Sequence, residues 1–166
     1  MIRRVLIGIS LFVVAMAARP AHAQLPIPSF AVVGGVSSYD LSGTGTTAVG
    51  ALRVDIPLLL LLAEGSLGVM RPKEDAGTRT YIIPEAQLQY QLFPLLVRPY
   101  IGVGAGWFRA VSGPDPLRND ITLSASAGVR LSIPLLPVGL RAEARLRGIG
   151  SGFGSSATEF TLGASF

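Results

Sequence analysis

Apolar and polar residues alternate one by one along most of the chain after residue 24, in stretches of about ten residues. In the clearest stretch, from Ile121 to Ile133, every second residue is apolar and the residues between are Thr, Ser, Gly or Arg. Side chains of a strand point alternately to two faces, whereas a helix would spread the same residues around its circumference. No stretch after residue 24 has an apolar stripe of period 3.6. The pattern therefore predicts an all-β protein.

Eight stretches of this kind predict eight strands, the first of which is apolar or small on both faces and has no clear sidedness. They cover residues 29–39, 48–56, 61–69, 84–92, 98–107, 121–133, 138–147 and 160–166. Three connections carry the phrase Pro-Leu-Leu, at Pro57, Pro94 and Pro134, and are short. The other four are longer and polar or Gly-rich, at about 40–46, 71–79, 110–119 and 148–156. Short turns at one end and longer loops at the other are typical of an eight-stranded antiparallel up-and-down transmembrane β-barrel, with periplasmic turns and extracellular loops.

Alternation alone also fits a soluble, lipocalin-like barrel with its apolar residues turned inward. Three features favour a membrane barrel. The apolar faces are free of charge at their centres, where one Arg or Lys facing lipid would cost ~2–4 kcal/mol. The polar faces use arginine, and Lys73, in a loop, is the only lysine after residue 24. Aromatic residues fall near strand ends, with Trp107 and Tyr39 expected at the outer interface and Phe30, Tyr90, Phe93 and Phe166 at the inner one.

The first residues have the order of a secretory signal peptide: Arg3 and Arg4, an apolar run, then Ala21 and Ala23 at −3 and −1 of a cleavage site. We expect residues 1–23 to be removed and residues 24–166 to form the barrel domain. Three of the 14 basic residues leave with the signal, so 14 − 3 = 11 remain against 10 acidic ones. The mature charge of about +1 gives no reason to expect a nucleic-acid partner.

Two stretches resemble known outer-membrane proteins. The end of the chain, Phe160 to Phe166, resembles the terminal strand signal that the barrel-assembly machinery reads, in which Phe160, Leu162, Ala164 and Phe166 would carry the signal. The Pro-Tyr and alternating-Gly stretch from Arg98 to Trp107 resembles a strand common in the OmpA-like barrel superfamily. The resemblance implies a location in the bacterial outer membrane, contact with its lipid and lipopolysaccharide, and handling by periplasmic chaperones. We expect no peptidoglycan-binding domain after Phe166.

Candidate catalytic chemistry is sparse. Barrel enzymes of the outer membrane that this chain could resemble depend on histidine, and the only histidine, His22, lies in the predicted signal peptide. The chain has no cysteine. The Gly-rich stretch 148–154 lacks the ending of a phosphate-binding loop. Acidic loop residues such as Glu74 and Asp75 could contact divalent cations, but such residues are usually only solvated. We expect no catalytic residue, no metal and no cofactor.

The main candidate site is the set of charges on the predicted inward faces. It consists of Arg53, Asp55, Glu64, Glu85, Arg98, Arg130, Arg141, Glu143, Arg145, Arg147 and Glu159. These charges could pair into a plug, because charges away from water must be paired, or they could line a narrow pore. Inward glycines at 102, 104, 106, 128 and 163 are expected to leave some space. We favour the plug, and with it a monomeric structural or surface-interaction barrel of the OmpA/OmpX type. The alternative is a small porin or a conduit for hydrophobic solutes similar to the outer-membrane protein W family.

Overall fold

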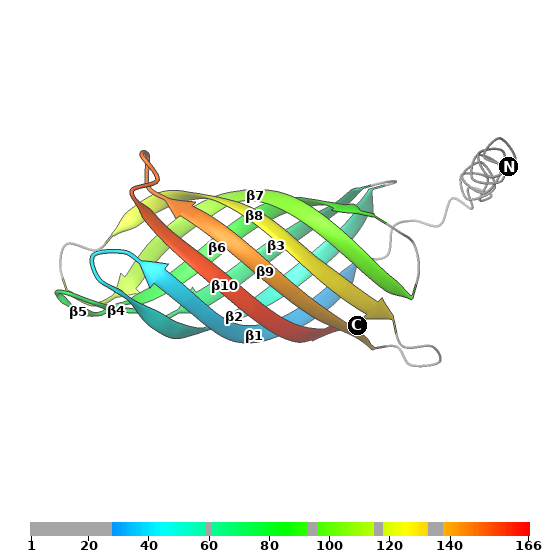
Figure 1. Cartoon of the computed structure of the whole chain (residues 1–166), viewed down its shortest axis with the longest axis horizontal. Helices are drawn as coiled ribbons and strands as arrows, with labels where there is room; N and C mark the ends of the chain where they lie inside the picture. Colours follow the sequence, from blue (N-terminus) through cyan, green and yellow to red (C-terminus); the bar gives the residue numbers. More distant parts are fainter. Residues whose placement is uncertain (1–27, 59–60, 93–95, 115–117, 133–137) are drawn as a thin grey trace, which may run out of the picture.

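The structure, a computed structural model, describes residues 28–58, 61–92, 96–114, 118–132 and 138–166. These residues contain no helix that is long and apolar enough to cross a membrane. Their strands follow one another along the chain (Figure 1). The bounds are β1 (Ser29–Asp40), β2 (Thr44–Leu58), β3 (Leu61–Met70), β4 (Lys73–Glu74), β5 (Gly77–Thr78), β6 (Thr80–Gln91), β7 (Val97–Ser112), β8 (Asn119–Ser132), β9 (Gly139–Ile149) and β10 (Ser155–Ser165).

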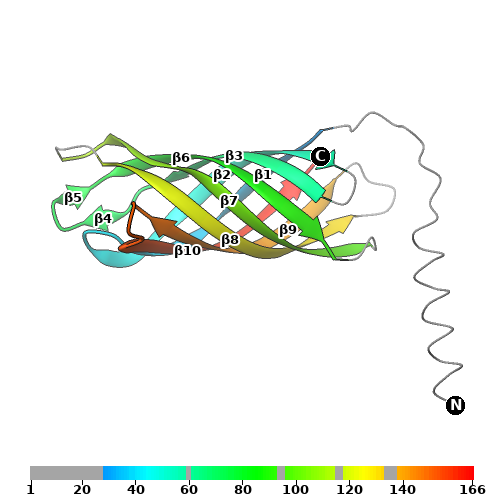
Figure 2. The ribbon, with the colours of Figure 1, turned by 90° about the horizontal axis from the view of Figure 1, so that it is seen from above.

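Eight of these strands form a closed barrel in the order β1-β10-β9-β8-β7-β6-β3-β2, so the predicted eight-stranded antiparallel barrel is confirmed. Strands β1 and β10 close it, with a register that runs from Ala31 opposite Ser165 to Asp40 opposite Ser156. The final residue joins this seam, since Phe30 and Phe166 exchange two backbone hydrogen bonds of 2.8 and 2.9 Å. We call the end where β1 begins and β10 ends the terminal end, and the opposite end the distal end (Figures 1 and 2).

The apolar faces of the strands point outward. Leu52, Val103 and Leu162 are 60%, 65% and 69% exposed, and large apolar side chains are exposed on every barrel strand. The residues between them on each strand point into the barrel, where charged and polar side chains are buried. A soluble barrel would have the opposite arrangement, because a broad exposed apolar surface is not stable in water. The soluble, lipocalin-like alternative is therefore wrong, because it places the apolar faces inside the barrel.

Several strands are longer at the distal end than their alternation predicts. Strand β6 begins at Thr80 instead of residue 84, and β10 begins at Ser155 instead of residue 160. The added residues of β6 lack alternation because apolar side chains occupy both faces: Ile82 points outward, while Tyr81 and Ile83 are buried. The first distal connection is only 41–43, and the predicted loop 71–79 contains the small hairpin β4–β5. Of the predicted Pro-Leu-Leu turns, residues 59–60, 93–95 and 133–137 lie outside the described residues.

The aromatic residues confirm most of the predicted positions. Trp107 points outward near the distal end, and Phe30, Tyr90 and Phe166 point outward near the terminal end. Tyr39 is different: only 5% of it is exposed and it points into the barrel, so its predicted place at the outer interface is wrong. The first strand is apolar or small on both faces, and its alternation could not decide which face Tyr39 takes. Phe93 lies outside the described residues.

Candidate functional site in the barrel interior

Strand β9 supplies four of the predicted interior charges, at every second position from Arg141 to Arg147. Arg145 lies at the centre of the group and is 1% exposed. Its guanidinium contacts three carboxylates: Glu143 on the same strand at 2.9 Å, Glu64 on β3 at 2.9 Å and Glu85 on β6 at 2.6 Å. Residues on opposite walls of the barrel are therefore joined through one side chain.

Towards the terminal end, Asp55 of β2 accepts two hydrogen bonds from Arg130 of β8, of 2.9 and 3.2 Å. The guanidinium groups of Arg130 and Arg141 lie over the ring of Tyr100, at 5.1 and 5.2 Å from its centroid. Its hydroxyl donates to Glu143 at 2.6 Å and accepts from Arg141 at 2.8 Å. The ring and the hydroxyl of this tyrosine thus both contact charged neighbours, an arrangement that favours guanidinium over ammonium groups.

Towards the distal end, Arg147 donates two hydrogen bonds to Glu159 of β10, of 2.6 and 3.3 Å, and also contacts Glu85. On the other wall, Arg53 of β2 lies 2.9 Å from Glu143 and 3.5 Å from Glu64. Each carboxylate of the group has at least one arginine partner, so the chain of ion pairs is continuous from Asp55 to Glu159.

The group contains five arginines and five carboxylates and carries no net formal charge. We call it the charged section; its members are Arg53, Asp55, Glu64, Glu85, Arg130, Arg141, Glu143, Arg145, Arg147 and Glu159. Arg98, the eleventh predicted residue, lies apart from it, half-buried near the terminal end, and donates to Ser132. Exact balance matters because an uncompensated charge in a site with little water costs several kcal/mol.

The inward glycines do not leave space, contrary to the prediction. A Cβ atom on Gly102 would lie 2.9 Å from Gln89, one on Gly104 would lie 2.8 Å from Glu85, and one on Gly128 would lie 2.5 Å from Tyr100. Polar side chains of neighbouring strands occupy the volume over these three glycines, and a Cβ atom on Gly106 or Gly163 would clash with the backbone of the neighbouring strand. Glycine is required at these positions because the interior is filled. The empty space that would have favoured a pore is therefore absent at these positions.

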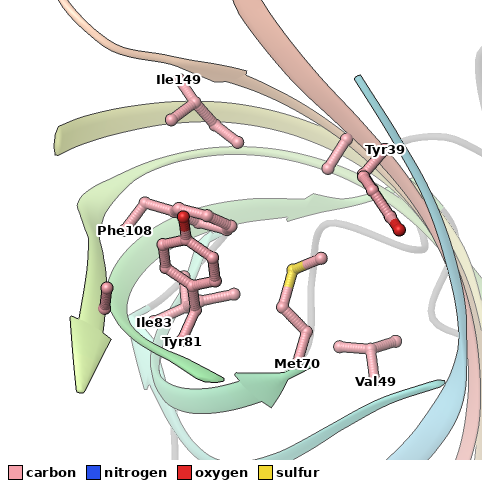
Figure 3. Packing of buried hydrophobic residues seen from close by; sticks show 9 residues of the cluster. Tyr39, Val49, Met70, Tyr81, Ile83, Phe108 and Ile149 are labelled. Atoms are coloured by element: carbon pink, nitrogen blue, oxygen red, sulfur yellow. The ribbon is translucent and has the colours of Figure 1, made fainter. Parts of the chain in front are cut away.

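The distal half of the interior is apolar, which the alternation did not predict. We call this cluster the apolar section; it consists of Tyr39, Val49, Met70, Tyr81, Ile83, Phe108, Ala110, Ile149 and Ala157 (Figure 3). The rings of Tyr81 and Phe108 pack with centroids 4.2 Å apart, and both residues are 0% exposed. The sequence contains one indirect indication of this section. Around residues 81–83 and 107–108 both faces of the strand are apolar, so no polar residue identifies the inward face.

The hairpin β4–β5 is fixed over this apolar section. Glu74 is buried and accepts hydrogen bonds of 2.5 Å from Tyr81 and 2.5 Å from Ser42, while Arg79 lies 3.3 Å from it. The hydroxyl of Tyr39 donates to the carbonyl of Lys73 at 2.8 Å and accepts from its amide at 2.9 Å. The expectation that Glu74 is simply solvated is wrong, because its carboxylate is buried and hydrogen-bonded to Tyr81 and Ser42.

The remaining predicted residues lie elsewhere. Phe160 and Leu162 of β10 and the following Phe166 point outward, and Ala164 of β10 is half-buried. Ala21 and Ala23 lie outside the described residues, so the cleavage site stays a prediction. Within the part of the chain that the structure describes, no cluster of histidine, cysteine or carboxylate side chains could hold a metal ion.

No family model matches the sequence, and no curated protein matches it. Solved structures do match. Neisserial surface protein A has a TM-score of 0.70 at 16% identity, over 83% of this chain and 95% of that one. Ail, the attachment invasion locus protein of Yersinia pestis, in complex with the heparin analogue sucrose octasulfate, gives 0.56 at 16%, over 84% and 97%. The N-terminal β-barrel domain of Pseudomonas aeruginosa OprF gives 0.54 at 14%, over 83% and 97%.

These matches define a class of fold. The chain has the fold of the small eight-stranded outer-membrane β-barrels of the OmpA-like and OmpX type. At 14 to 16% identity the likeness concerns the fold and its orientation of faces, and the role of the interior must be argued from the residues.

Proposed function

We propose that this protein is a monomeric, non-enzymatic barrel of the bacterial outer membrane that stabilises the membrane and has a closed lumen. The observation that carries the proposal is the filled interior, in which the charged section is followed by the apolar section and the hairpin β4–β5. A closed barrel leaves no strand edge for a second copy to pair with, which supports a monomer. The absence of histidine and cysteine from residues 24–166 supports a non-enzymatic role.

The closed lumen follows from the order of the two sections. An ion entering from the terminal end would have to separate pairs such as Arg145–Glu85, whose members are held at 2.6 Å and have almost no contact with water. Leaving one member of such a pair unpaired costs about 3–5 kcal/mol. The same ion would then meet the tightly packed side chains of Met70, Tyr81 and Phe108. Both barriers act in series.

A structural role is favoured over loop-mediated contact with a partner. Two of the distal connections are short, residues 41–43 and 150–154, and a third is folded back as the hairpin β4–β5. Short connections present little surface for recognition. Ail was crystallised with a heparin analogue; a corresponding surface contact in this chain is the second part of the proposal.

Export and assembly complete the proposal. Cleavage after Ala23 would deliver the chain to periplasmic chaperones, and the barrel-assembly machinery would read the alternate apolar residues that end at Phe166. The backbone pairing of Phe166 with Phe30 supports this role, because the terminal residue takes part in the closing seam. Deletion of Phe166 is expected to lower the yield of inserted barrel, measured as the fraction with heat-shifted mobility on a gel; normal insertion would contradict it.

The experiment that tests the proposal uses the mature chain in lipid vesicles. Extraction that requires detergent, heat-shifted mobility and no measurable passage of ions or small sugars are the expected results. The alternative, a conduit for hydrophobic solutes, is favoured by one observation, the apolar section at the distal mouth. Uptake of a hydrophobic dye above that of protein-free vesicles would support that alternative, and extraction of the protein without detergent would contradict both.

A further inference from the structure

Two exposed arginines at the distal end have no side-chain partner among the residues that the structure describes. Arg71, just after β3, and Arg109, on β7, are exposed, and neither side chain forms an ion pair or hydrogen bond with a described residue. This contrasts with the interior, where each of the five arginines of the charged section is paired. Exposed, unpaired guanidinium groups beside an apolar surface are available to a ligand.

The strand register places both arginines on one outward patch. Ile82 of β6 pairs with Val69 of β3 on one side and with Arg109 of β7 on the other, and Arg71 follows Val69 by two residues. Val69, Ile82 and Arg109 therefore share the outward face, and Arg71, one residue past the end of β3, is exposed next to them. Strands β3 and β7 are two strand spacings apart, about 10 Å. Arginine side chains at that separation can reach two groups of one ligand.

The tilt of the strands brings the two arginines to the same height. From Arg109, the paired positions lead once round the barrel and return to Pro99, 109 − 99 = 10 residues nearer the terminal end. From β7 to β3, two strands along the barrel wall, a row of paired residues therefore moves about 2.5 residues towards the terminal end, as expected for tilted strands. Arg71 lies two residues beyond Val69, which offsets this descent almost completely.

An apolar groove lies below this patch. Trp107 is two residues from Arg109 on the same face and is 58% exposed. Further towards the terminal end, small outward residues on β3, β6 and β7 form a groove of about 750 Å³, within the range of ligand sites. Its floor and walls include Ala63, Gly65, Ala86, Leu88, Val103 and Ala105. From the distal end, the two arginines thus come first, then the indole of Trp107, then the apolar groove. A phosphorylated lipid has the same order, with its phosphates outermost, then the membrane interface, then the acyl chains.

We propose that Arg71, Arg109 and Trp107 bind a phosphorylated glycolipid of the outer leaflet, with one acyl chain in the groove. Guanidinium groups pair with phosphate through two parallel hydrogen bonds, and an indole is favoured at a membrane interface. Two separated cations fit a head group with two phosphates. The proposal rests on the outer-membrane location proposed above.

A second copy of this chain is a poorer occupant of the same surface. In a twofold-symmetric contact the same patch faces itself. Arg71 and Arg109 of one copy would then face the same two arginines of the other, and juxtaposed like charges are repulsive. Charge complementarity therefore selects an anionic partner.

Trp107 provides the test, because it is the only tryptophan of the chain. The mature protein is inserted into vesicles of brominated phosphatidylcholine, which quench the indole, and bisphosphorylated lipid A is added. Displacement of brominated lipid from the patch restores the fluorescence. Each of Arg71→Gln and Arg109→Gln is expected to require about fivefold more lipid A for half recovery, as for loss of one exposed ion pair. Arg109→Lys is expected to retain most of the binding.

Lys73→Gln is the matched control. It removes the same charge from the exposed hairpin β4–β5 rather than from the barrel wall, and is expected to leave the titration unchanged. Dephosphorylated lipid A and phosphatidylglycerol are expected to give little recovery. Equal recovery with either lipid, or equal effects of Lys73→Gln and Arg109→Gln, would overturn the site. Heat-shifted mobility in the same vesicles separates the two proposals: failure to insert contradicts the membrane location, whereas insertion without phosphate-dependent recovery contradicts only the lipid site.

Discussion

The two halves of the barrel interior are filled by different chemistry. In the terminal half, five arginines and five carboxylates form a continuous set of ion pairs around Arg145. In the distal half, Tyr81, Phe108 and neighbouring apolar residues pack together and are covered by the hairpin β4–β5. The wall is the same in both halves, since the same eight strands run through them. The interior composition is therefore not dictated by the barrel geometry.

The two halves differ in what makes a substitution destabilising. Ion pairs in a site without water depend on charge balance, and the removal of one member leaves an uncompensated charge. Apolar packing depends on volume, and the cost of a substitution follows the cavity that remains. The charged section fixes specific partners across the lumen, such as Arg53 with Glu143 at 2.9 Å. The apolar section excludes water from the distal half of the lumen.

The largest effect is expected from Arg145→Met. This substitution leaves Glu64, Glu85 and Glu143 with one shared cation fewer, and should lower the free energy of unfolding by about 3–5 kcal/mol. Urea titration of the protein in detergent micelles measures it. Arg71→Met is the matched control, because Arg71 is exposed and unpaired among the described residues, and should change stability by less than about 0.5 kcal/mol. Equal effects of the two would contradict the role of the charged section.

The apolar section is tested by Phe108→Ala. The side chain is 0% exposed, and its removal leaves a cavity, so we expect a loss of about 3 kcal/mol in the same titration. Phe160→Ala makes the same change on the outward face, where 58% of the side chain is exposed. Detergent or lipid replaces the lost contact there, because acyl chains are as apolar as the side chain. A loss at Phe160 as large as that at Phe108 would mean that the distal interior is loosely packed.

A smaller effect is expected where the wall meets the charged section. A methyl group at Gly128 would lie 2.5 Å from the ring of Tyr100, which contacts Glu143 and Arg141. Gly128→Ala should cost about 1–3 kcal/mol through the displaced ring. Gly65→Ala should be nearly neutral, because nothing lies within 4 Å of the added atom. Comparison of the two unfolding midpoints measures the difference, and a neutral Gly128→Ala would show that the interior has spare volume after all.

The smallest effect is expected from Tyr39→Phe, which removes the hydroxyl that holds Lys73. Loss of these hydrogen bonds should lower stability by about 1 kcal/mol. Tyr90→Phe controls for the substitution, since Tyr90 is exposed and points outward. Proteolytic cleavage within the hairpin β4–β5 gives a second measurement, because a released hairpin is cut faster. Identical cleavage rates for the two variants would argue against this anchoring role.

The same comparison explains which parts were predictable from the sequence. Arg145 and its neighbours stand at every second position among Ala and Leu, so the pattern assigned them to the interior. Their partners were not predictable, because Arg53 and Glu143 are 90 residues apart and meet only through the register of the closed barrel. The sequence predicted a near balance of six arginines against five carboxylates, while the exact balance and the pairing required the geometry, which places Arg98 apart.

The apolar section escaped prediction for a physical reason. A strand that is apolar towards both lipid and interior has no alternation, so Tyr39 was placed outside and residues 80–83 were omitted from a strand. Glu74 was equally unpredictable, because a carboxylate in a loop is usually solvated and its burial depends on the folding back of the hairpin. Alternation identifies a strand only where its two faces meet different environments.

The most direct measurement of the central claim, a barrel whose lumen is closed by two filled sections, is single-channel recording in planar lipid bilayers. The mature protein, inserted and shown to have heat-shifted mobility, should produce no reproducible, well-resolved conductance steps. Steps of constant size, present with the folded protein and absent with buffer or unfolded chain, would contradict the closed lumen and favour a small pore.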